Sequence, residues 1–145
     1  PVAELLRYMK DKTIKDVKPL CTKTGGFVSL LGTSDARSVS DRAMDGDKTA
    51  KRAWDAMIYQ IIKYIGAMST VLHGKVDGIL LGGGMVYNKE LVKQISEACS
   101  FIAPVYAYPG EFELEAMNAG AARVLSGEET AREYTGVPRW NGFEE

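Results

Sequence analysis

The sequence predicts an α/β protein, and three features of its second half support this fold class. Two short apolar runs, residues 76–81 and 101–108, have the length and composition of buried parallel strands. Each run ends in a turn rich in glycine or proline, and helical periodicity follows it at 89–99 and 113–125. The order strand, turn, helix, strand, turn, helix is typical of a sheet with helices packed on it.

A long amphipathic helix is predicted ahead of the first strand, from Asp47 to His73. Asp47 can cap its start, and Gly74 can supply the left-handed residue that ends it. His73 falls in the last predicted turn, where a partial positive charge is favourable, and we assign it no catalytic role. The face that the apolar residues form must lie against a sheet or another helix. These residues are Ala50, Trp54, Met57, Ile58, Ile61, Ile62, Ile65, Met68 and Leu72.

Shorter elements are expected before this helix. Apolar residues have helical spacing at 2–9, and a short helix is predicted either before Pro19 or just after it. An apolar segment at 27–31 stops at Gly32, and a further helix is predicted within 34–46.

At the other end of the chain, the predicted helix at 113–125 reaches its stop at Gly127. Residues 128–134 are expected to add a turn or two of helix, and residues 135–145 to be loosely ordered.

Composition and charge narrow the class of protein. The chain has 145 residues, of which 46% are hydrophobic and 26% charged, as in one ordinary globular domain. A formal net charge of -1, with acids and bases interspersed, argues against nucleic acid as a partner, and no apolar run approaches the length of a membrane span. Cys21 and Cys99 form no disulfide framework, so a cytoplasmic location is expected. Because the chain does not begin with Met, we expect it to be a piece of a longer protein.

The three consecutive glycines, Gly82 to Gly84, lie between the first strand and the helix that follows it. Ligands collect at this edge of α/β sheets, and a helix N-terminus favours anions. However, a G-x-G-x-x-G motif would need glycine where Tyr87 stands, and no Gly-Lys-Ser/Thr follows for a P-loop. From the spacing alone, a phosphate or nucleotide surface and a plain tight turn both remain open.

Four stretches, taken in order, resemble the C-terminal part of the butyrate kinases: LLGTSDAR, AWDAMIYQIIKYIGAM, VDGILLGGGMVYN and FIAPVYAYPGEFELEAMNAGAARVLSGEE. That family belongs to the acetate kinase branch of the sugar kinase, Hsp70 and actin superfamily. The resemblance implies a ribonuclease-H-like, actin-like ATPase lobe with an incomplete sheet, and residues 1–145 would be the C-terminal nucleotide-binding lobe of a two-lobed acyl kinase. It also implies transfer of phosphate between ATP and butyrate or another short-chain carboxylate, giving ADP and the acyl phosphate.

The same resemblance implies a nucleotide role for the segment SDAR. Asp35 and Arg37 would border the adenosine of ATP or ADP, with Ala36 at a position that contacts the base. From the residues alone, a different interpretation is open, in which Asp35 caps a helix and Arg37 is a solvated helix residue.

The glycine turn resembles the adenosine motif of the family. Gly83, Gly84 and Met85 would approach the nucleotide, and Asn88 would bond to it while also capping the next helix. Gly82 departs from the family pattern, which has threonine there, so a hydroxyl contact is lost.

The resemblance also implies residues for metal binding, although the match in sequence is less direct than at the glycine turn. In acetate kinases a glutamate in the corresponding turn belongs to the Mg²⁺ and phosphate environment. Matching the two turns at Pro109 places Phe112 at that position, with Glu111 and Glu113 beside it. We expect one of these two glutamates to contribute to Mg²⁺ binding, although an acid near a helix start also favours the helix dipole on its own.

Two classes of function therefore stay open. In the first, the chain is the C-terminal part of an active acyl kinase, and the residues that perform phosphoryl transfer lie outside it, so that we assign no catalytic residue here. In the second, it is a non-catalytic actin-like module for nucleotide binding or assembly. In both, the absence of the leading strands would expose a sheet edge and an apolar face, so self-association into a homo-oligomer is expected.

Overall fold

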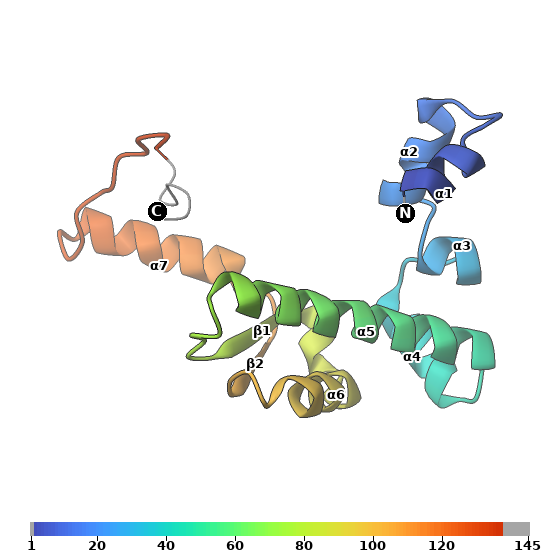
Figure 1. Ribbon diagram of the computed structural model, residues 1–145. Coiled ribbons are helices and arrows are strands. Elements are labelled where there is room, and N and C mark those ends of the chain that lie inside the picture. The colour runs from blue at the N-terminus through green and yellow to red at the C-terminus, as the bar shows by residue number, and fades with distance from the viewer. Residues whose placement is uncertain (1, 138–145) are drawn as a thin grey trace. The chain divides into compact units, whose positions relative to one another are not determined.

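The computed structural model describes residues 2–137, and its internal contacts divide the chain into two units. The first unit extends to Gly110 and the second begins at Glu111. Figure 1 labels the α-helices and strands of both units along the chain.

The centre of the first unit is a small parallel sheet. β1 (Ile79–Gly83) pairs with β2 (Val105–Pro109), the first residue of one strand opposite the first of the other and the last opposite the last. The 3-10 helix η1 (Gly84–Tyr87) and helix α6 (Lys89–Cys99) make the crossover that two parallel strands require. This mixed architecture confirms the predicted α/β class.

The strands begin later than their apolar runs predicted. The amide of Ile79 donates to the carbonyl of Pro104 at 2.8 Å, which opens the ladder, so β1 covers residues 79–83 instead of 76–81. β2 correspondingly begins at Val105 rather than at residue 101. Gly82 and Gly83 both pair with β2, so two of the three glycines belong to the strand and not to the turn after it.

Helix α5 (Lys48–Val71) is the long helix that the apolar stripe predicted. Asp47 caps it, because its Oδ1 accepts hydrogen bonds from two backbone amides of the first turn at 2.9 and 3.0 Å. The prediction for His73 is wrong: the left-handed stop includes His73 (φ 53°) as well as Gly74 (φ 72°), so His73 lies beyond the helix. Although α5 has 24 residues, no helix in the part of the chain that the structure describes is long and apolar enough to cross a membrane.

An ion pair spans the connection between α4 (Ala36–Met44) and α5. Arg42 donates from Nη2 and Nε to Oδ2 of Asp47, at 2.7 and 3.1 Å. The hydrogen bond from the Ala50 amide, together with the Arg42 guanidinium, holds the pKa of the Asp47 carboxyl below its ordinary value. One carboxylate thus both caps the start of α5 and, through Arg42, holds the end of α4 next to it.

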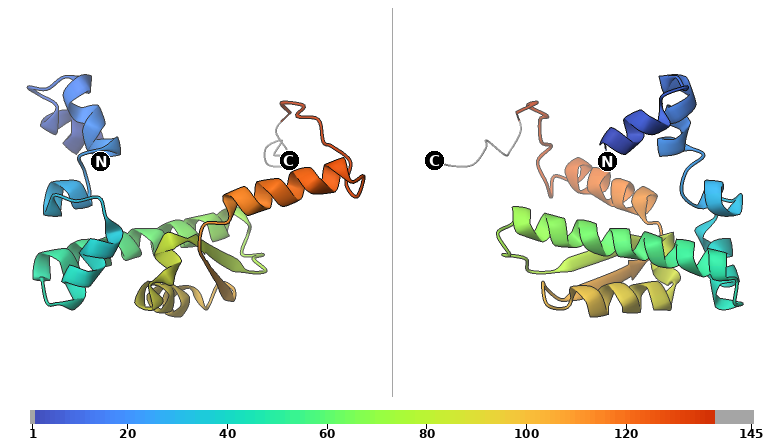
Figure 2. Two further views of the ribbon diagram at one scale, coloured as in Figure 1. Left: turned by 180° about the vertical axis from the view of Figure 1, so that it is seen from behind. Right: turned by 45° about the vertical axis from the view of Figure 1, so that its right-hand side comes forward.

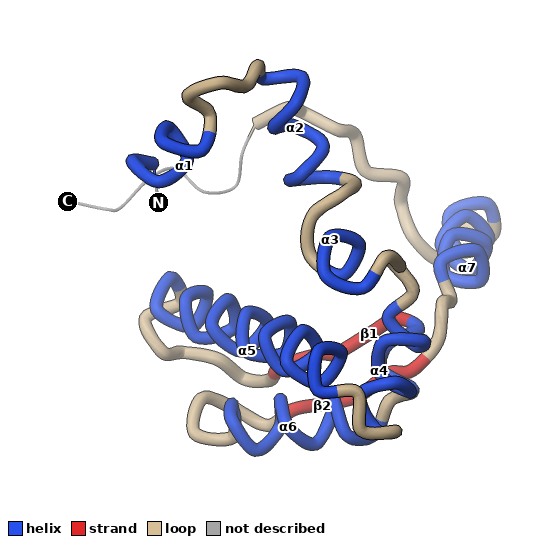
Figure 3. Tube along the Cα trace, turned by 90° about the vertical axis from the view of Figure 1, so that its right-hand side faces the viewer, coloured by secondary structure: helices blue, strands red, loops and turns tan. Residues whose placement is uncertain are grey.

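The core of the first unit lies among α4, α5, α6 and β1. Figures 2 and 3 show α5 and α6 running alongside the two strands. The predicted stripe of α5 is packed only along its first part, since Met68 and Leu72 are 56% and 53% exposed. The buried cluster consists of Val39, Ala43, Ala50, Trp54, Ile58, Ile79, Leu91, Ile95, Cys99 and Ala103.

Two short helices, α1 (Val2–Tyr8) and α2 (Ile14–Thr22), begin the chain. Pro19 lies inside α2, so the expectation of a helix on one side of this proline is wrong. The start of α2 is secured by Asp16, whose Oδ2 accepts from the amide of Thr13 at 2.7 Å and from its hydroxyl at 2.8 Å.

The apolar segment before α4 is a single helical turn, α3 (Phe27–Leu31). It begins after Gly26 and ends at Gly32, both with positive φ. Phe27 stacks on Trp54 of α5, with ring centroids 6.4 Å apart, and this contact joins α3 to the core.

The second unit contains α7 (Glu113–Leu125), with the bounds that the sequence predicted. Gly127 (φ 78°) follows its end, and Arg123 Nε donates to Glu129 Oε1 at 2.8 Å across the stop. No further helix forms at 128–134, so that prediction is wrong. Residues 135–137 have no regular structure, and the rest of the predicted loose segment lies outside the described residues.

Candidate functional site

The end of β1 and the start of η1 form an open stretch of backbone. Gly83 has φ 92°, a conformation that favours glycine, and it precedes Gly84, the first residue of η1. An ideal Cβ placed on Gly82 or on Gly83 would have no atom within 4 Å. The backbone here is therefore accessible to a ligand, as the nucleotide interpretation of this turn requires.

The 3-10 helix η1 has one buried side chain and one exposed side chain at its centre. Val86 is buried at 7% exposure, whereas Met85 beside it is 38% exposed. The carbonyl of Met85 accepts from the amide of Asn88 at 3.0 Å, which fixes the end of the turn.

Asn88 makes hydrogen bonds with both ends of its side-chain amide. Its Oδ1 accepts from the amide of Leu91 at 2.9 Å, which confirms the predicted cap of α6. Its Nδ2 donates to the hydroxyl oxygen of Ser40 on α4 at 2.6 Å, across 48 positions of sequence. The second Nδ2 hydrogen and the second lone pair of Oδ1 are the parts of this side chain that a nucleotide could still engage.

Ser40 is the residue that the sequence did not reveal. It is 3% exposed and is the one buried polar side chain among the residues that the structure describes. A serine within the polar segment SVSDR gives no signal of burial, and only its partner Asn88, the N-cap of α6, makes its role visible.

The segment SDAR forms the start of α4. Asp35 caps this helix, with Oδ1 accepting from the amide of Arg37 at 3.0 Å, while its own amide donates to the hydroxyl of Thr33 at 3.1 Å. Ala36 packs partly buried against the core, and Arg37 is exposed. The capping role is thus present, and the nucleotide role of all three residues stays a prediction.

Glu111 and Glu113, the predicted metal residues, belong to the second unit. Both side chains are exposed, and Glu113 is the first residue of α7. Within the described ranges there is no group of three or more histidines, cysteines or acids that could hold a metal ion by itself. Since Mg²⁺ is usually held by one or two carboxylates together with water and substrate phosphates, these residues remain compatible with it.

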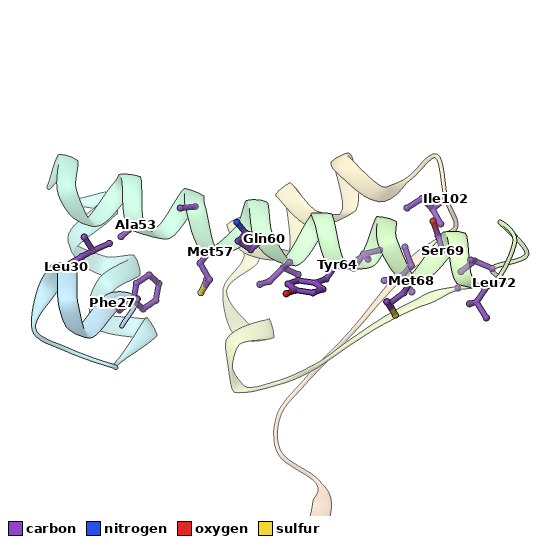
Figure 4. A pocket seen from close by; sticks show the side chains of 17 residues that line it. Phe27, Leu30, Ala53, Met57, Gln60, Tyr64, Met68, Ser69, Leu72 and Ile102 are labelled. Carbon is purple, nitrogen blue, oxygen red and sulfur yellow. The ribbon is translucent and has the colours of Figure 1, made fainter. Parts of the chain in front are cut away.

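The first unit also has an apolar cavity away from the glycine turn. It is a groove of about 900 Å³ along α5, between Phe27 and Leu30 of α3 at one end and Leu72 at the other (Figure 4). Its lining is almost wholly apolar, and it includes none of the residues predicted to contact a nucleotide. Its chemistry suits covering by another apolar surface better than it suits a polar ligand.

The family of the chain follows from comparison with known proteins. A sequence model of the Acetokinase family matches residues 2–134, and the chain belongs to this family. Its relatives include Butyrate kinase 2 of Clostridium acetobutylicum, 45% identical over 128 residues, which are 88% of this chain and 35% of that protein. Probable butyrate kinase 2 of Caldanaerobacter subterraneus subsp. tengcongensis is 46% identical over 127 residues (88% and 36%).

A third relative, Butyrate kinase 1 of Clostridium acetobutylicum, is 43% identical over 136 residues, 92% of this chain and 38% of that protein. The chain thus spans a little more than a third of the length of the curated relatives that it matches. The resemblance on which the sequence interpretation depended is confirmed at the level of the family.

Proposed function

We propose that this chain is the C-terminal, actin-like nucleotide-binding lobe of a butyrate kinase. The whole enzyme would transfer phosphate from ATP to butyrate, giving butyryl phosphate and ADP, and would work in the cytoplasm, where ATP is available. The observation that carries the proposal is identity of 43–46% to proteins named butyrate kinase across most of this chain.

The site geometry supports the nucleotide part of this proposal. The open backbone at Gly82 and Gly83 lets a ligand approach closely, and the N-terminus of α6 favours an anion. The hydrogen bond between Asn88 and Ser40 joins this turn to α4, the helix that Arg37 helps to begin. We assign ATP or ADP to this surface, with Asp35, Ala36 and Met85 at its border.

Mg²⁺ would neutralise charge on the phosphates during transfer. Glu111 or Glu113 would hold it together with water and phosphate oxygens, in keeping with the small number of carboxylates that this ion uses. We assign no catalytic residue to the chain, because the groups that orient the carboxylate and the transferred phosphate would lie in the rest of the enzyme. The chain by itself is expected to bind nucleotide without turnover.

The exposed apolar residues of α5 are also consistent with a lobe that belongs to a larger protein. Along the groove, Tyr64 and Met68 are 69% and 56% exposed, in a helix whose buried residues all lie in its first half. We propose that this face is covered in the whole enzyme and that the isolated chain self-associates through it. Sedimentation at increasing concentration should show a rising mean mass, and a mass constant at that of the monomer would contradict this part of the proposal.

Calorimetric titration of Mg·ADP into the chain tests the nucleotide surface. Arg37→Ala and Asn88→Ala should each weaken binding about tenfold or more, because each removes a polar partner of a charged ligand. Lys63→Ala, an exposed change on α5, is the control and should bind as the wild type does. Absence of binding to the folded wild-type chain, or equal binding by all the variants, would refute a nucleotide site here.

A further inference from the structure

The buried hydroxyl of Ser40 occupies an unusual place in α4. Its neighbours in the buried face of this helix, Val39 and Ala43, are apolar and are 0% and 8% exposed. A hydroxyl at such a position destabilises the fold unless it has a hydrogen-bond partner. Asn88 Nδ2 supplies that partner at 2.6 Å, so the two side chains depend on each other.

The side-chain amide of Asn88 is held at both ends, and this fixes its orientation. The amide of Leu91 can donate only to Oδ1, so Nδ2 must point to Ser40. The backbone amide of Asn88 in turn donates to the carbonyl of Met85 at 3.0 Å. A continuous path of hydrogen bonds therefore leads from α4, through Ser40 and Asn88, to the turn after the glycines.

On α4, Ser40 also shares a face with the start of the helix. Ala36 and Arg37 are four and three positions before it, and residues at these spacings are neighbours on one side of an α-helix. The segment that begins α4 is therefore presented on the same side as the bond to Asn88. Ser40 ties together the two segments that the nucleotide proposal needs, although it belongs to neither.

We propose that Ser40 is a positioning residue, which acts through Asn88 to hold the glycine turn in register with the start of α4. The inference rests on the proposed nucleotide site and extends it, since no role in nucleotide contact is given to Ser40 itself. Its hydroxyl sets where Met85 and Arg37 stand relative to each other before a ligand arrives. Binding of nucleotide would then need little rearrangement, which is how preorganisation raises affinity.

The test combines Ser40→Ala, Asn88→Ala and the double variant in the 145-residue chain, with Mg·ADP as the probe. Ser40→Ala should weaken Mg·ADP binding about fivefold to tenfold, in the range of one hydrogen bond. The double variant should bind no more weakly than Asn88→Ala alone, because Ser40 acts only through that residue. Ser96→Ala, which removes a hydroxyl from a half-buried position of α6, should change nothing.

A second readout does not depend on nucleotide. In spectra of the free protein, Ser40→Ala should shift the backbone amide resonances of Gly84, Met85 and Arg37, while Ser96→Ala should leave them in place. If the wild-type chain binds no Mg·ADP, the proposed function fails, and these shifts alone decide whether Ser40 couples the two segments. Unchanged resonances in a folded Ser40→Ala protein overturn the inference, as does wild-type affinity for Mg·ADP.

The Ser40→Ala protein has to be folded for either readout. If Ser40→Ala does not fold, Ser40→Cys takes its place, since a thiol keeps a heavy atom at this position but is a weak hydrogen-bond partner. The same losses are expected of it. Wild-type affinity together with wild-type resonances in Ser40→Cys would overturn the proposal in the same way.

Discussion

Truncation of Ile95 tests whether α6 is held in place by the core. Ile95 is 1% exposed and belongs to the cluster formed by α4, α5, α6 and β1. Ile95→Ala removes three carbon atoms, which at about 0.8 kcal/mol each amount to roughly 2.4 kcal/mol of lost burial. The cavity left among rigid neighbours adds roughly 1 kcal/mol. We therefore expect the free energy of unfolding to fall by about 3.5 kcal/mol, a large part of the stability of a domain of this size.

The chain offers a matched control in Ile14, which has the same side chain and is 74% exposed at the start of α2. Ile14→Ala should change the free energy of unfolding by less than about 0.5 kcal/mol, as is usual for surface positions. Urea denaturation followed by circular dichroism compares the two variants with the wild type under identical conditions. If Ile95→Ala lost less than about 1 kcal/mol, or no more than the control, α6 would not be packed as described, and the glycine turn would lack its support.

Three further predictions concern single groups. Gly83→Ala should destabilise the fold by about 1–2 kcal/mol, because φ is 92° there, whereas Gly82→Ala, with open space around it and no positive φ, should be tolerated in thermal denaturation. The pKa of Asp47 is lowered in the folded protein, so its carboxylate stabilises the fold fully above the unfolded-state pKa, about 3.8. This contribution is lost as the pH falls through the folded-state pKa. In Asp47→Asn, the free energy of unfolding should therefore fall less steeply with decreasing pH in the acid range. Burial raises the pKa of the Cys99 thiol, so a thiol reagent at neutral pH should label the exposed Cys21 first, and equal rates would contradict the burial of Cys99.

Where local and periodic signals agreed, the sequence was sufficient to predict the structure. The apolar periodicity of α6 coincides with an Asn88 cap, and α7 has both a helical pattern and a glycine stop, so each was located to the residue. The strands were misplaced because apolar content does not mark where a ladder begins: Pro104 offers a carbonyl to Ile79, and the pairing follows from there.

The candidate site was predicted less completely than the fold. The glycine turn, Asp35 and Asn88 carry local signals of capping and of backbone freedom, and the structure has those local features. Ser40 has no such signal, because its importance comes from a contact across 48 positions that no periodicity encodes. The family resemblance supplied what local patterns lack, and the nucleotide and metal roles that it implies remain to be tested by binding.

The uneven cover of α5 means that one continuous helix joins two regions of different local stability. Its first half is fastened by Trp54 and Ile58, 4% and 2% exposed, whereas its last turns carry Met68 and Val71 at 56% and 61% exposure. Opening of the last turns exposes little new apolar surface, so it needs far less free energy than unfolding of the whole unit. Amide hydrogens should therefore exchange with deuterium in a gradient along the helix axis, fast near Val71 and slow near Trp54. Any chain segment or protein that covers the groove would slow exchange most at the fast end.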